Sequence, residues 1–451
     1  MNAAMKGSLS CEDSGMEEYI MKLFGAMNIK DNELIIGGVK ISELVNEYNT
    51  PLYVMNEELI RSNCKRYYKA FYCESEKNRV TYAGKAFLNM YMCNILKEEG
   101  FYLDVVSGGE LYTSYKANFP LEHVYFHGNN KTRDEIELGV KLGVGRFVVD
   151  NFCELNVLNS ISKSYNKVQK IYLRITPGIE AHTHEYIKTG QLDSKFGFPL
   201  IEESIIHVVN EVLKLENIEL TGIHCHIGSQ IFDLQPFKDD AKIMVTLANN
   251  IYKKTGHLIK EIDFGGGFGI YYTKEDKPKE IEEYCSAILD TAEKVCEELN
   301  FPRPVFSIEP GRSLIGNAGT TLYTIGAIKE IENIRKYVCV DGGMADNIRP
   351  ALYNAKYECL IANRVSGDKF EDVTIAGKCC ESGDILIDNI RLNEPKTGDI
   401  LAVLSTGAYG YSMASNYNRI PRAAVVMVSN GKSKLACKRE SYDDIIRNDC
   451  V

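Results

Sequence analysis

One pattern recurs eight times between residues 80 and 310: a short apolar run rich in β-branched residues, then a longer stretch with helical spacing. Two of the predicted helices are LNMYMCNILKEEG (88–100) and IEEYCSAILDTAEKVCEEL (281–299). Strands that alternate with helices predict a parallel sheet. Eight such units favour a closed (β/α)8 barrel, with an open doubly wound sheet as the alternative. The predicted strands are VTYAGKAF (80–87), YLDVVS (102–107), HVYFHGN (123–129), RFVVDN (146–151), KIYLRITPG (170–178), LTGIHCHIG (220–228), IDFGGGF (262–268) and VFSIEPG (305–311).

Beyond residue 315 the pattern changes to short alternating runs separated by turn residues, such as KYVCVD, DVTIAG, DILIDN, DILAVLS and AAVVMVS. Such runs predict a mainly antiparallel, β-barrel-like domain. The earlier stretch ELIIGGVKI (33–41) has the same character and is expected to join it. The sequence therefore predicts an α/β chain with three parts. They are a leader (1–30, with a possible amphipathic helix around 16–27), a β domain (31–56 plus 316–451) and a barrel (57–315).

The composition is that of a globular protein, with 451 residues, 45% hydrophobic and 25% charged. The formal net charge is -10 and no basic block occurs, so nucleic acid and anionic membranes are not expected partners. We find no apolar run long enough to span a bilayer and no signal segment at the start. The 14 cysteines are scattered without a C-x-x-C motif, which indicates reduced thiols and a cytoplasmic protein.

Polar residues gather where the predicted strands end. Lys85 lies in the C-terminal half of the first run, among apolar neighbours. In a (β/α)8 barrel the C-terminal strand ends share one rim, which carries the chemistry in enzymes of this fold. We therefore predict a site at this rim, formed by Lys85, His127, His226, Ser229, Gly265, Gly266, Gly267, Glu309 and Arg312.

The stretch DFGGGFGI (263–270) is suited to holding an anion. Three consecutive glycines remove side chains and leave backbone N–H groups able to face a phosphate. The dinucleotide motif G-x-G-x-x-G fails because Ile270 occupies its third glycine position, and GKS at 431–433 lacks the earlier glycine of a P-loop. A cofactor with one phosphate fits better than a nucleotide.

Four of these features together indicate pyridoxal 5'-phosphate. Lys85 can form a Schiff base with an aldehyde, and we expect it to be buried, because desolvation favours the neutral amine that attacks a carbonyl. The glycines can hold the phosphate. His226 can lie against the ring, and the carboxylate of Glu309 can keep the pyridine nitrogen protonated, which makes the ring an electron sink.

Motifs along nearly the whole chain after about residue 30 resemble those of the diaminopimelate decarboxylase family, fold-type III pyridoxal phosphate enzymes related to ornithine decarboxylase and alanine racemase. The motifs are YAGKAF (82–87), FHGNNK (126–131), HTHEYIKTGQLDSKFGF (182–198), HCHIGSQ (224–230), DFGGGFG (263–269), EPGRS (309–313), CESGD (380–384) and GAYGYSMASNYN (407–418).

The resemblance implies roles at these positions. Lys85 would carry the cofactor, His226 would stack on its ring, and Glu309 would pair with the ring nitrogen. An arginine, as in alanine racemase, would weaken the electron sink, so Glu309 favours decarboxylation. The phosphate would be held by Ser229, the amides of Gly265–Gly267 and Tyr409.

The implied reaction is the decarboxylation of meso-2,6-diaminopimelate to L-lysine and CO2, the last step of lysine biosynthesis. Two arginines, Arg312 and Arg349, can clamp the distal carboxylate of this amino acid. The hydroxyl of Tyr353 can add a donor, and Glu381 can accept from the distal ammonium. Tyr409 is expected beside the substrate as well as the phosphate.

Cys380 would protonate the carbanion, because the family places this cysteine, with Glu381, at the partner's cofactor across a homodimer interface. Cys379 has no comparable role. No metal site is expected, and the family places His182 and His184 in a loop near the mouth of the site. Two alternatives remain open: a decarboxylase of ornithine or arginine, and a non-catalytic regulatory relative.

Overall fold

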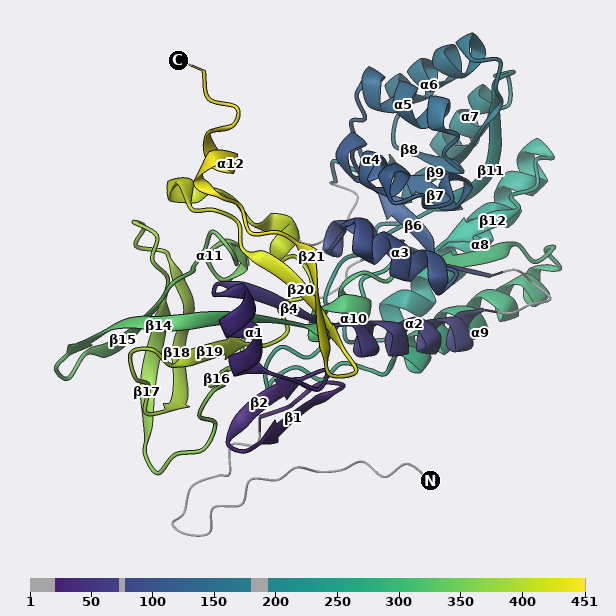
Figure 1. The fold of residues 1–451 in the computed structure, drawn as a ribbon. Helices are drawn as coiled ribbons and strands as arrows, with labels where there is room; N and C mark the ends of the chain where they lie inside the picture. Colours follow the sequence, from purple (N-terminus) through teal and green to yellow (C-terminus); the bar gives the residue numbers. More distant parts are fainter. Residues whose placement is uncertain (1–20, 73–77, 180–193, 451) are drawn as a thin grey trace. The chain divides into compact units, whose positions relative to one another are not determined.

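The computed structural model describes residues 21–72, 78–179 and 194–450, which divide into two compact units (Figure 1). One unit contains the chain up to Ile60, the short segment Tyr272–Glu275 and everything from Ile315 onward. The other contains Arg61–Tyr271 and Asp276–Leu314. Within these ranges no helix is both long enough and apolar enough to cross a membrane.

The second unit is a closed parallel barrel. Each strand pairs in parallel with the next, and the ring closes where the fourth strand meets the fifth and the last meets the first. The predicted (β/α)8 barrel is therefore confirmed, and the open sheet is wrong. The barrel strands are β5 (Arg79–Ala83), β6 (Tyr102–Val105), β7 (Val124–Phe126), β8 (Arg146–Val149), β9 (Gln169–Thr176), β11 (Ile218–His224), β12 (Glu261–Asp263) and β13 (Val305–Ile308), and the short β10 (Phe198–Pro199) lies beside β9.

Helices surround these strands, and neighbouring helices pack on one another (Figure 1). The last long helix matches its predicted range, 281–299, residue for residue, whereas the first helix after β5 is shorter than predicted. The helices are α2 (Glu57–Phe71), α3 (Met90–Glu98), α4 (Gly108–Lys116), α5 (Arg133–Leu142), α6 (Phe152–Ser164), α7 (Glu202–Val212), α8 (Gln235–Thr255), α9 (Ile281–Leu299) and α10 (Arg312–Ile315).

Several of these helices begin at a capping side chain immediately after the rim. Asn89, Ser107, Thr132 and Asn151 each accept a hydrogen bond from a backbone N–H in the first turn of the helix that follows. Such caps satisfy backbone donors that have no partner inside the helix. They set where α3, α4, α5 and α6 begin, and so limit the loops that carry the rim residues.

The predicted strands extend too far at their C-terminal ends. The first strand ends at Ala83, and Gly84–Ala86 form a 3-10 turn, η1. The seventh ends at Asp263, because Gly265 and Gly267 have φ of +65° and +111°, which are incompatible with an extended ladder. The eighth ends at Ile308. The polar residues placed at strand ends by the sequence therefore lie mostly in the loops just beyond them.

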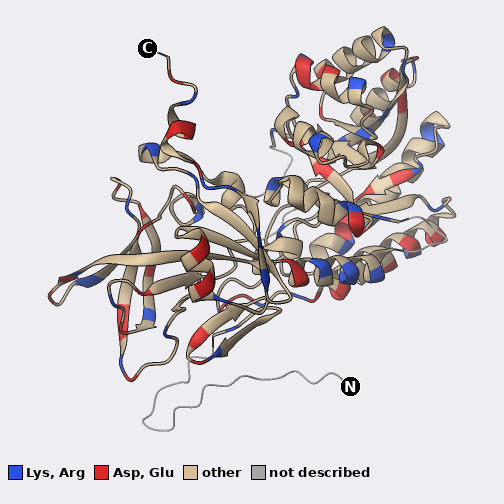
Figure 2. Cartoon of the chain, in the orientation of Figure 1, with Lys and Arg blue, Asp and Glu red and all other residues tan. Residues whose placement is uncertain are grey.

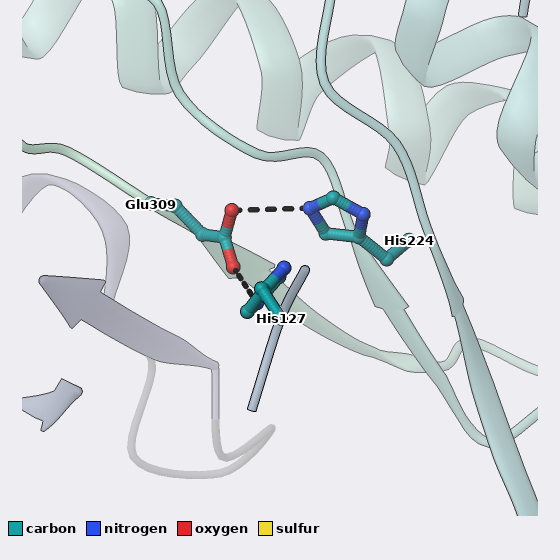
Figure 3. Close-up of side chains that lie close together, drawn as sticks. All are labelled: His127, His224 and Glu309. Atoms are coloured by element: carbon teal, nitrogen blue, oxygen red, sulfur yellow. Dashed lines mark hydrogen bonds and ion pairs between the residues drawn. The ribbon is translucent and has the colours of Figure 1, made fainter. Parts of the chain in front are cut away.

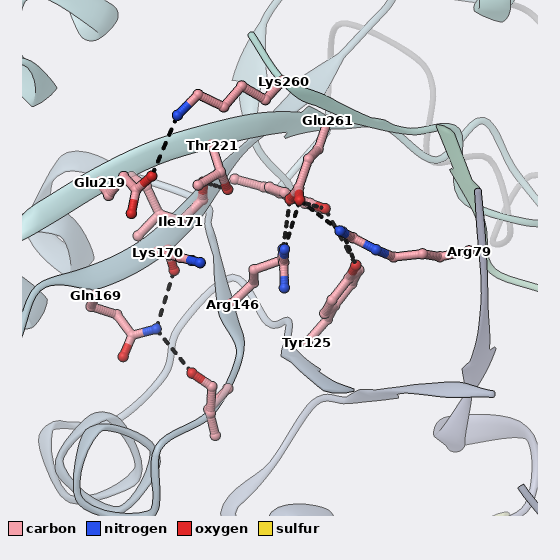
Figure 4. Close-up of polar contacts among 12 residues, drawn as sticks. Arg79, Tyr125, Arg146, Gln169, Lys170, Ile171, Glu219, Thr221, Lys260 and Glu261 are labelled. Carbon is pink, nitrogen blue, oxygen red and sulfur yellow. Dashed lines mark hydrogen bonds and ion pairs between the residues drawn. The ribbon is translucent and has the colours of Figure 1, made fainter. Parts of the chain in front are cut away.

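A buried ion network fills the N-terminal end of the barrel interior (Figure 4). Arg146 donates through Nε and Nη2 to both carboxylate oxygens of Glu261, at 2.6 and 2.7 Å, and Nη2 of Arg79 lies 2.8 Å from Oε1. The hydroxyl of Tyr172 donates to Glu261 at 2.8 Å, and Arg79 donates to Tyr125 at 3.0 Å. Because Arg79, Arg146 and Glu261 are the first residues of their strands, this layer lies opposite the rim.

The first unit is built on a sheet in which most neighbours are antiparallel, as predicted. Two pairs are parallel: β15 with β17, and β20 with β4. The strand β4 precedes the barrel in the chain, yet it lies between β14 and β20, which follow the barrel. The strands of this sheet are β4 (Leu52–Asn56), β14 (Gly319–Ile331), β15 (Arg335–Val340), β16 (Cys359–Ile361), β17 (Phe370–Ala376), β18 (Ile385–Asn393), β19 (Ile400–Val403), β20 (Ala424–Ser429) and β21 (Lys432–Cys437).

A small separate sheet and three short helices complete this unit. The stretch 33–41 forms β2 and β3 of the small sheet, and backbone hydrogen bonds link it to the segment around Ala362. The helix suggested around 16–27 lies largely outside the described residues, and residues 21–26 form no helix. These elements are β1 (Met27–Lys30), β2 (Glu33–Ile36), β3 (Val39–Lys40), α1 (Ile41–Tyr48), α11 (Arg349–Tyr353) and α12 (Tyr442–Ile446).

Acidic and basic residues are interspersed along the helices that surround the barrel (Figure 2). This distribution agrees with the mixed charges of the sequence and its formal net charge of -10.

Candidate active site

A pocket of about 350 Å³ lies at the C-terminal rim of the barrel. Four of the predicted site residues line it together, although they come from the loops after β5, β7, β11 and β13: Lys85, His127, His226 and Glu309. Its size falls in the range of small-molecule sites. The lining residues are Lys85, Asp104, Val106, His127, Gly128, Asn129, Arg174, Lys195, Phe196, His224, His226 and Glu309.

Lys85 occupies the middle of the turn η1, immediately after β5. Its neighbours Gly84 and Ala86 are buried, but the Lys85 side chain is exposed. The expectation of a buried lysine is therefore wrong. The physical reason is that the chain leaves the strand at Ala83, so that the turn carries residue 85 beyond the rim to the pocket.

Glu309 is buried between two histidines (Figure 3). Its Oε2 lies 3.0 Å from Nε2 of His224 in a hydrogen bond, and its Oε1 lies 2.8 Å from Nε2 of His127. Burial alone would raise the pKa of Glu309, but the two imidazoles outweigh it and hold the pKa well below its usual range. Glu309 is therefore a carboxylate at neutral pH.

Two further carboxyl groups, Asp104 and Asp263, lie near Glu309 at the ends of β6 and β12, and their pKa values are shifted upward. Burial raises the pKa of Asp104 to about 6, although His127 and Lys85 oppose this. Burial and the negative charge of Glu309 raise the pKa of Asp263 well above its usual range. At neutral pH Asp104 is therefore still mostly ionised beside Glu309, whereas Asp263 is shifted toward its neutral form.

The glycine triplet packs against the strand ends on either side of it. A Cβ on Gly266 would lie 2.1 Å from the carbonyl oxygen of Glu309, and one on Gly265 would lie 2.4 Å from that of Cys225. Only glycine fits such close approaches. In this arrangement the Gly265 N–H donates to Asp263 Oδ1 at 2.9 Å, and the Gly266 N–H donates to His226 Nδ1 at 3.2 Å.

His226 and Ser229 follow β11. Burial and the nearby charge of Lys85 hold the pKa of His226 well below its usual range, so its imidazole is neutral. Because its Nδ1 accepts from Gly266, the ring proton lies on Nε2. The hydroxyl of Ser229 accepts from Nη2 of Arg312 at 2.9 Å, so these two predicted residues lie together.

The pocket residues that were not predicted include Asp104, Arg174 and His224. Each is a polar or charged residue inside an otherwise apolar strand: YLDVVS, KIYLRITPG and LTGIHCHIG. Lys85 was predicted from the same feature, a charged residue among apolar neighbours. Arg174 is buried, its guanidinium stacks 4.3 Å from the Phe196 ring centroid, and no acidic side chain of the described residues lies within ion-pair distance of it.

The remaining predicted residues belong to the sheet unit. Arg349 is buried in a group of tyrosines, and its Nε donates to the Tyr357 hydroxyl at 3.0 Å. Its guanidinium lies 5.4 and 5.6 Å from the ring centroids of Tyr353 and Tyr409. Among the described residues no carboxylate lies within ion-pair distance of it, so it is not a surface ion pair.

Cys380 and Glu381 lie on an exposed turn before β18. The Cys380 N–H donates to the side-chain oxygen of Asn418 at 2.8 Å, and the Glu381 side chain accepts from the Gly383 N–H at 3.2 Å. Cys379 is buried and its N–H donates to Asp384. His182 and His184 lie outside the described residues.

The rim residues fit a pyridoxal cofactor. The pocket presents an amine, a buried carboxylate and neutral imidazoles, which is the donor set such a cofactor requires. In addition, Asp104 Oδ1 and His224 Nδ1 are buried and have no hydrogen-bond partner in the described part of the chain. Buried polar atoms normally have partners, so these two indicate a pocket built for a polar ligand.

The chain matches a family described as "Pyridoxal-dependent decarboxylase, pyridoxal binding domain" over residues 57–316. It is 51% identical over 423 residues to the diaminopimelate decarboxylase of Bacillus subtilis (strain 168), covering 92% of this chain and 95% of that protein. It is 42% identical to the enzyme of the same name from Staphylococcus aureus (strain COL), covering 94% and 100% of the two chains.

The fold is similar to the crystal structure of diaminopimelate decarboxylase from M. jannaschii in complex with L-lysine. The TM-score is 0.89, the sequence identity is 35%, and the match covers 94% of this chain and 98% of that one.

Proposed function

The chain belongs to the diaminopimelate decarboxylase family of pyridoxal-dependent enzymes, and from that premise we propose that it converts meso-2,6-diaminopimelate to L-lysine and CO2. It is a carboxy-lyase that depends on pyridoxal phosphate, and this reaction ends lysine biosynthesis. The observation that carries the proposal is the convergence of Lys85, His226 and Glu309 on one rim pocket. A relative with 35% identity was crystallised with L-lysine, the product of this reaction.

The rim residues would share the work of holding the cofactor. When bound, pyridoxal phosphate supplies an electron-accepting ring conjugated to the substrate amine. The Lys85 amine would bind the cofactor aldehyde, the neutral imidazole of His226 would lie against the ring, and the Glu309 carboxylate would accept from the ring nitrogen. Ser229, the glycine triplet 265–267 and Tyr409 would hold the phosphate, and Arg312 donates to the Ser229 hydroxyl.

The distal end of the substrate requires a second set of groups. The guanidiniums of Arg312 and Arg349 bind the distal carboxylate, with the Tyr353 hydroxyl as a further donor, and Glu381 accepts from the distal ammonium. The burial of Arg349 without a carboxylate partner among the described residues supports this, because a buried cation is stabilised by an incoming anion. Ornithine and arginine have no distal carboxylate to occupy this position.

The substrate assignment is tested by comparing amino acids. We expect CO2 release from meso-diaminopimelate and far less from ornithine or arginine. Arg349→Ala should lower kcat/KM for diaminopimelate by about 10²-fold, since a charged hydrogen bond is lost. Arg335→Ala is the matched control, because Arg335 forms an exposed ion pair with Asp388 in the same unit. Equal turnover of ornithine, or indifference to Arg349→Ala, would disprove the assignment.

We further propose a homodimer with shared sites, in which Cys380 and Glu381 of one subunit act at the cofactor of the partner. Cys380 then donates the proton that replaces CO2. The exposure of both residues supports this, because a residue that serves another subunit must be accessible from its own. We also expect a cytoplasmic location, and no disulfide joins the described cysteines, in keeping with a reducing compartment.

If the two subunits share their active sites, the activity should depend on dimer formation. On dilution below the dimer dissociation constant, specific activity should fall in step with the dimer fraction measured by sedimentation. A monomer that keeps full specific activity would contradict the proposal.

A further inference from the structure

Each carboxylate oxygen of Glu309 faces one imidazole nitrogen (Figure 3). His224 ends β11 and forms a hydrogen bond of 3.0 Å, whereas His127 follows β7 and makes a contact of 2.8 Å that is less well directed. The rings lie nearly perpendicular, with centroids 4.8 Å apart. All three side chains are buried. Two imidazoles and one carboxylate from three separate strand ends thus form one cluster.

The distances dictate where the protons lie. A carboxylate can only accept hydrogen bonds, so each imidazole nitrogen that faces it must carry a proton. An unprotonated nitrogen there would place its lone pair about 3 Å from a lone pair of the carboxylate oxygen, and the two would repel each other. With the proton on Nε2, Nδ1 of neutral His224 becomes an acceptor, and this atom is buried without a partner among the described residues. The low pKa of Glu309 agrees with this arrangement.

We propose that His127 and His224 are positioning residues that act through Glu309: their Nε2–H groups fix the carboxylate in one orientation and in its charged form. A carboxylate has about four lone-pair sites, so two remain after the imidazoles have bound. One of these would accept from the ring nitrogen of the cofactor. This inference rests on the proposed function, because that function assigns Glu309 to the ring nitrogen.

The same three side chains could instead hold a divalent metal, since their donor atoms all lie within 4.8 Å of one another. Metal binding would require a bare nitrogen, and so the opposite location of each ring proton. The two arrangements are therefore distinguished by where the imidazole protons lie. Other charged or titratable groups close to the cluster are Asp104 (β6), Asp263 (β12), Arg174 (β9), Lys85 (η1) and His226 after β11.

The first test observes the protons directly. ¹⁵N NMR of the purified full-length protein, labelled at its 8 histidines, should show Nε2–H signals for His127 and His224 at pH 7, assigned by their loss in His127→Gln and His224→Gln. Nε2 signals without an attached proton at both rings, or tight binding of one Zn²⁺ by the purified protein at these nitrogens, would overturn the proposal. This test does not depend on which substrate is used.

The second test separates positioning from a structural role. His224→Leu removes the donor, and kcat should fall by roughly 10²-fold with little change in KM, as for loss of one preorganised donor. His224→Gln can still donate an amide N–H and should recover at least a tenth of the activity. His127→Leu should have a smaller effect, because its contact is less well directed. His207→Leu, on the exposed face of α7, is the matched control.

Equal losses in His224→Leu and His224→Gln at unchanged melting temperature would overturn the positioning role. If the wild-type protein released no CO2 from diaminopimelate while the Nε2–H signals were present, the proposed function would fail and the proton arrangement would stand. The two failures are therefore distinguishable.

Discussion

Lys85→Ala should yield a folded protein that has lost the visible absorbance of its covalently held cofactor and nearly all CO2 release. Lys85 supplies the proposed amine that binds the cofactor aldehyde, and alanine offers no nucleophile in its place. We expect activity to fall by roughly 10⁴-fold or more, because the covalent link to the cofactor is lost. Absorbance spectra and CO2 release from meso-diaminopimelate measure the two effects.

Lys195→Ala is the matched control, because Lys195 lines the same pocket and has the same charge. It should keep the visible absorbance. Circular dichroism of both variants shows whether the fold survives, which we expect because Lys85 is exposed and lies in a turn rather than in the sheet. A coloured Lys85→Ala protein, or loss of colour in Lys195→Ala alone, would remove Lys85 from its proposed role.

Glu261→Gln should lower the free energy of unfolding by about 3–5 kcal/mol, the cost typical of removing one partner from a buried ion pair. Glu261 is the carboxylate to which both Arg79 and Arg146 bind inside the barrel (Figure 4). The glutamine has nearly the same shape, so packing is kept, but two buried guanidiniums lose their counter-charge. Urea-induced unfolding measures the difference.

The control is Glu219→Gln in the same barrel. Glu219 lies 3.7 Å from Lys260, and both side chains are largely exposed, so the expected change is about 0–1 kcal/mol (Figure 4). Similar losses in the two variants would show that the buried network has no special part in stability.

The pH dependence of folding stability provides a second test of the role of Glu261. Burial alone raises the pKa of this carboxyl, but Arg146 and Arg79 outweigh burial and bring the pKa to about 2. The unfolded value is about 4.3. Because the pKa of Glu261 is lower in the folded state than in the unfolded state, its ionised form stabilises the fold. This stabilisation is complete when the pH is above the unfolded-state pKa, and it is lost as the pH falls to the folded-state pKa. The stability gap between wild type and Glu261→Gln should therefore shrink between about pH 4.5 and pH 2.

Much of the barrel was predictable because each strand is a compact apolar run bounded by turn or helix signals. The rim followed from the same pattern, since parallel strands must bring their C-terminal ends together. That is why Lys85, His226 and Glu309, far apart in the sequence, line one pocket. Their individual roles, and those of Ser229, Arg349 and Cys380, remain predictions.

Other features depend on contacts that no local pattern records. The exposure of Lys85 follows from a 3-10 turn whose residues, Gly84–Ala86, look like a continuation of the strand. The pairing of Glu309 with His127 and His224 requires knowing which side chains on three separate strands point inward. Asp104 and Arg174 were missed because each lies inside its apolar run, whereas the prediction relied on polar residues near the C-terminal ends of the runs.

The place of β4 has a consequence for the order of synthesis. Its five residues, LYVMN, are all buried between β14 and β20, yet roughly 260 residues separate β4 from β14 in the chain. At about 5–20 residues per second, a ribosome needs on the order of 13–50 s to make that interval. Through that time the nascent chain carries an apolar strand whose two neighbours do not yet exist, and the barrel sequence is completed before either of them. Such an unpaired strand is a template for association with other chains, so it is at this stage of translation that the protein most needs a chaperone.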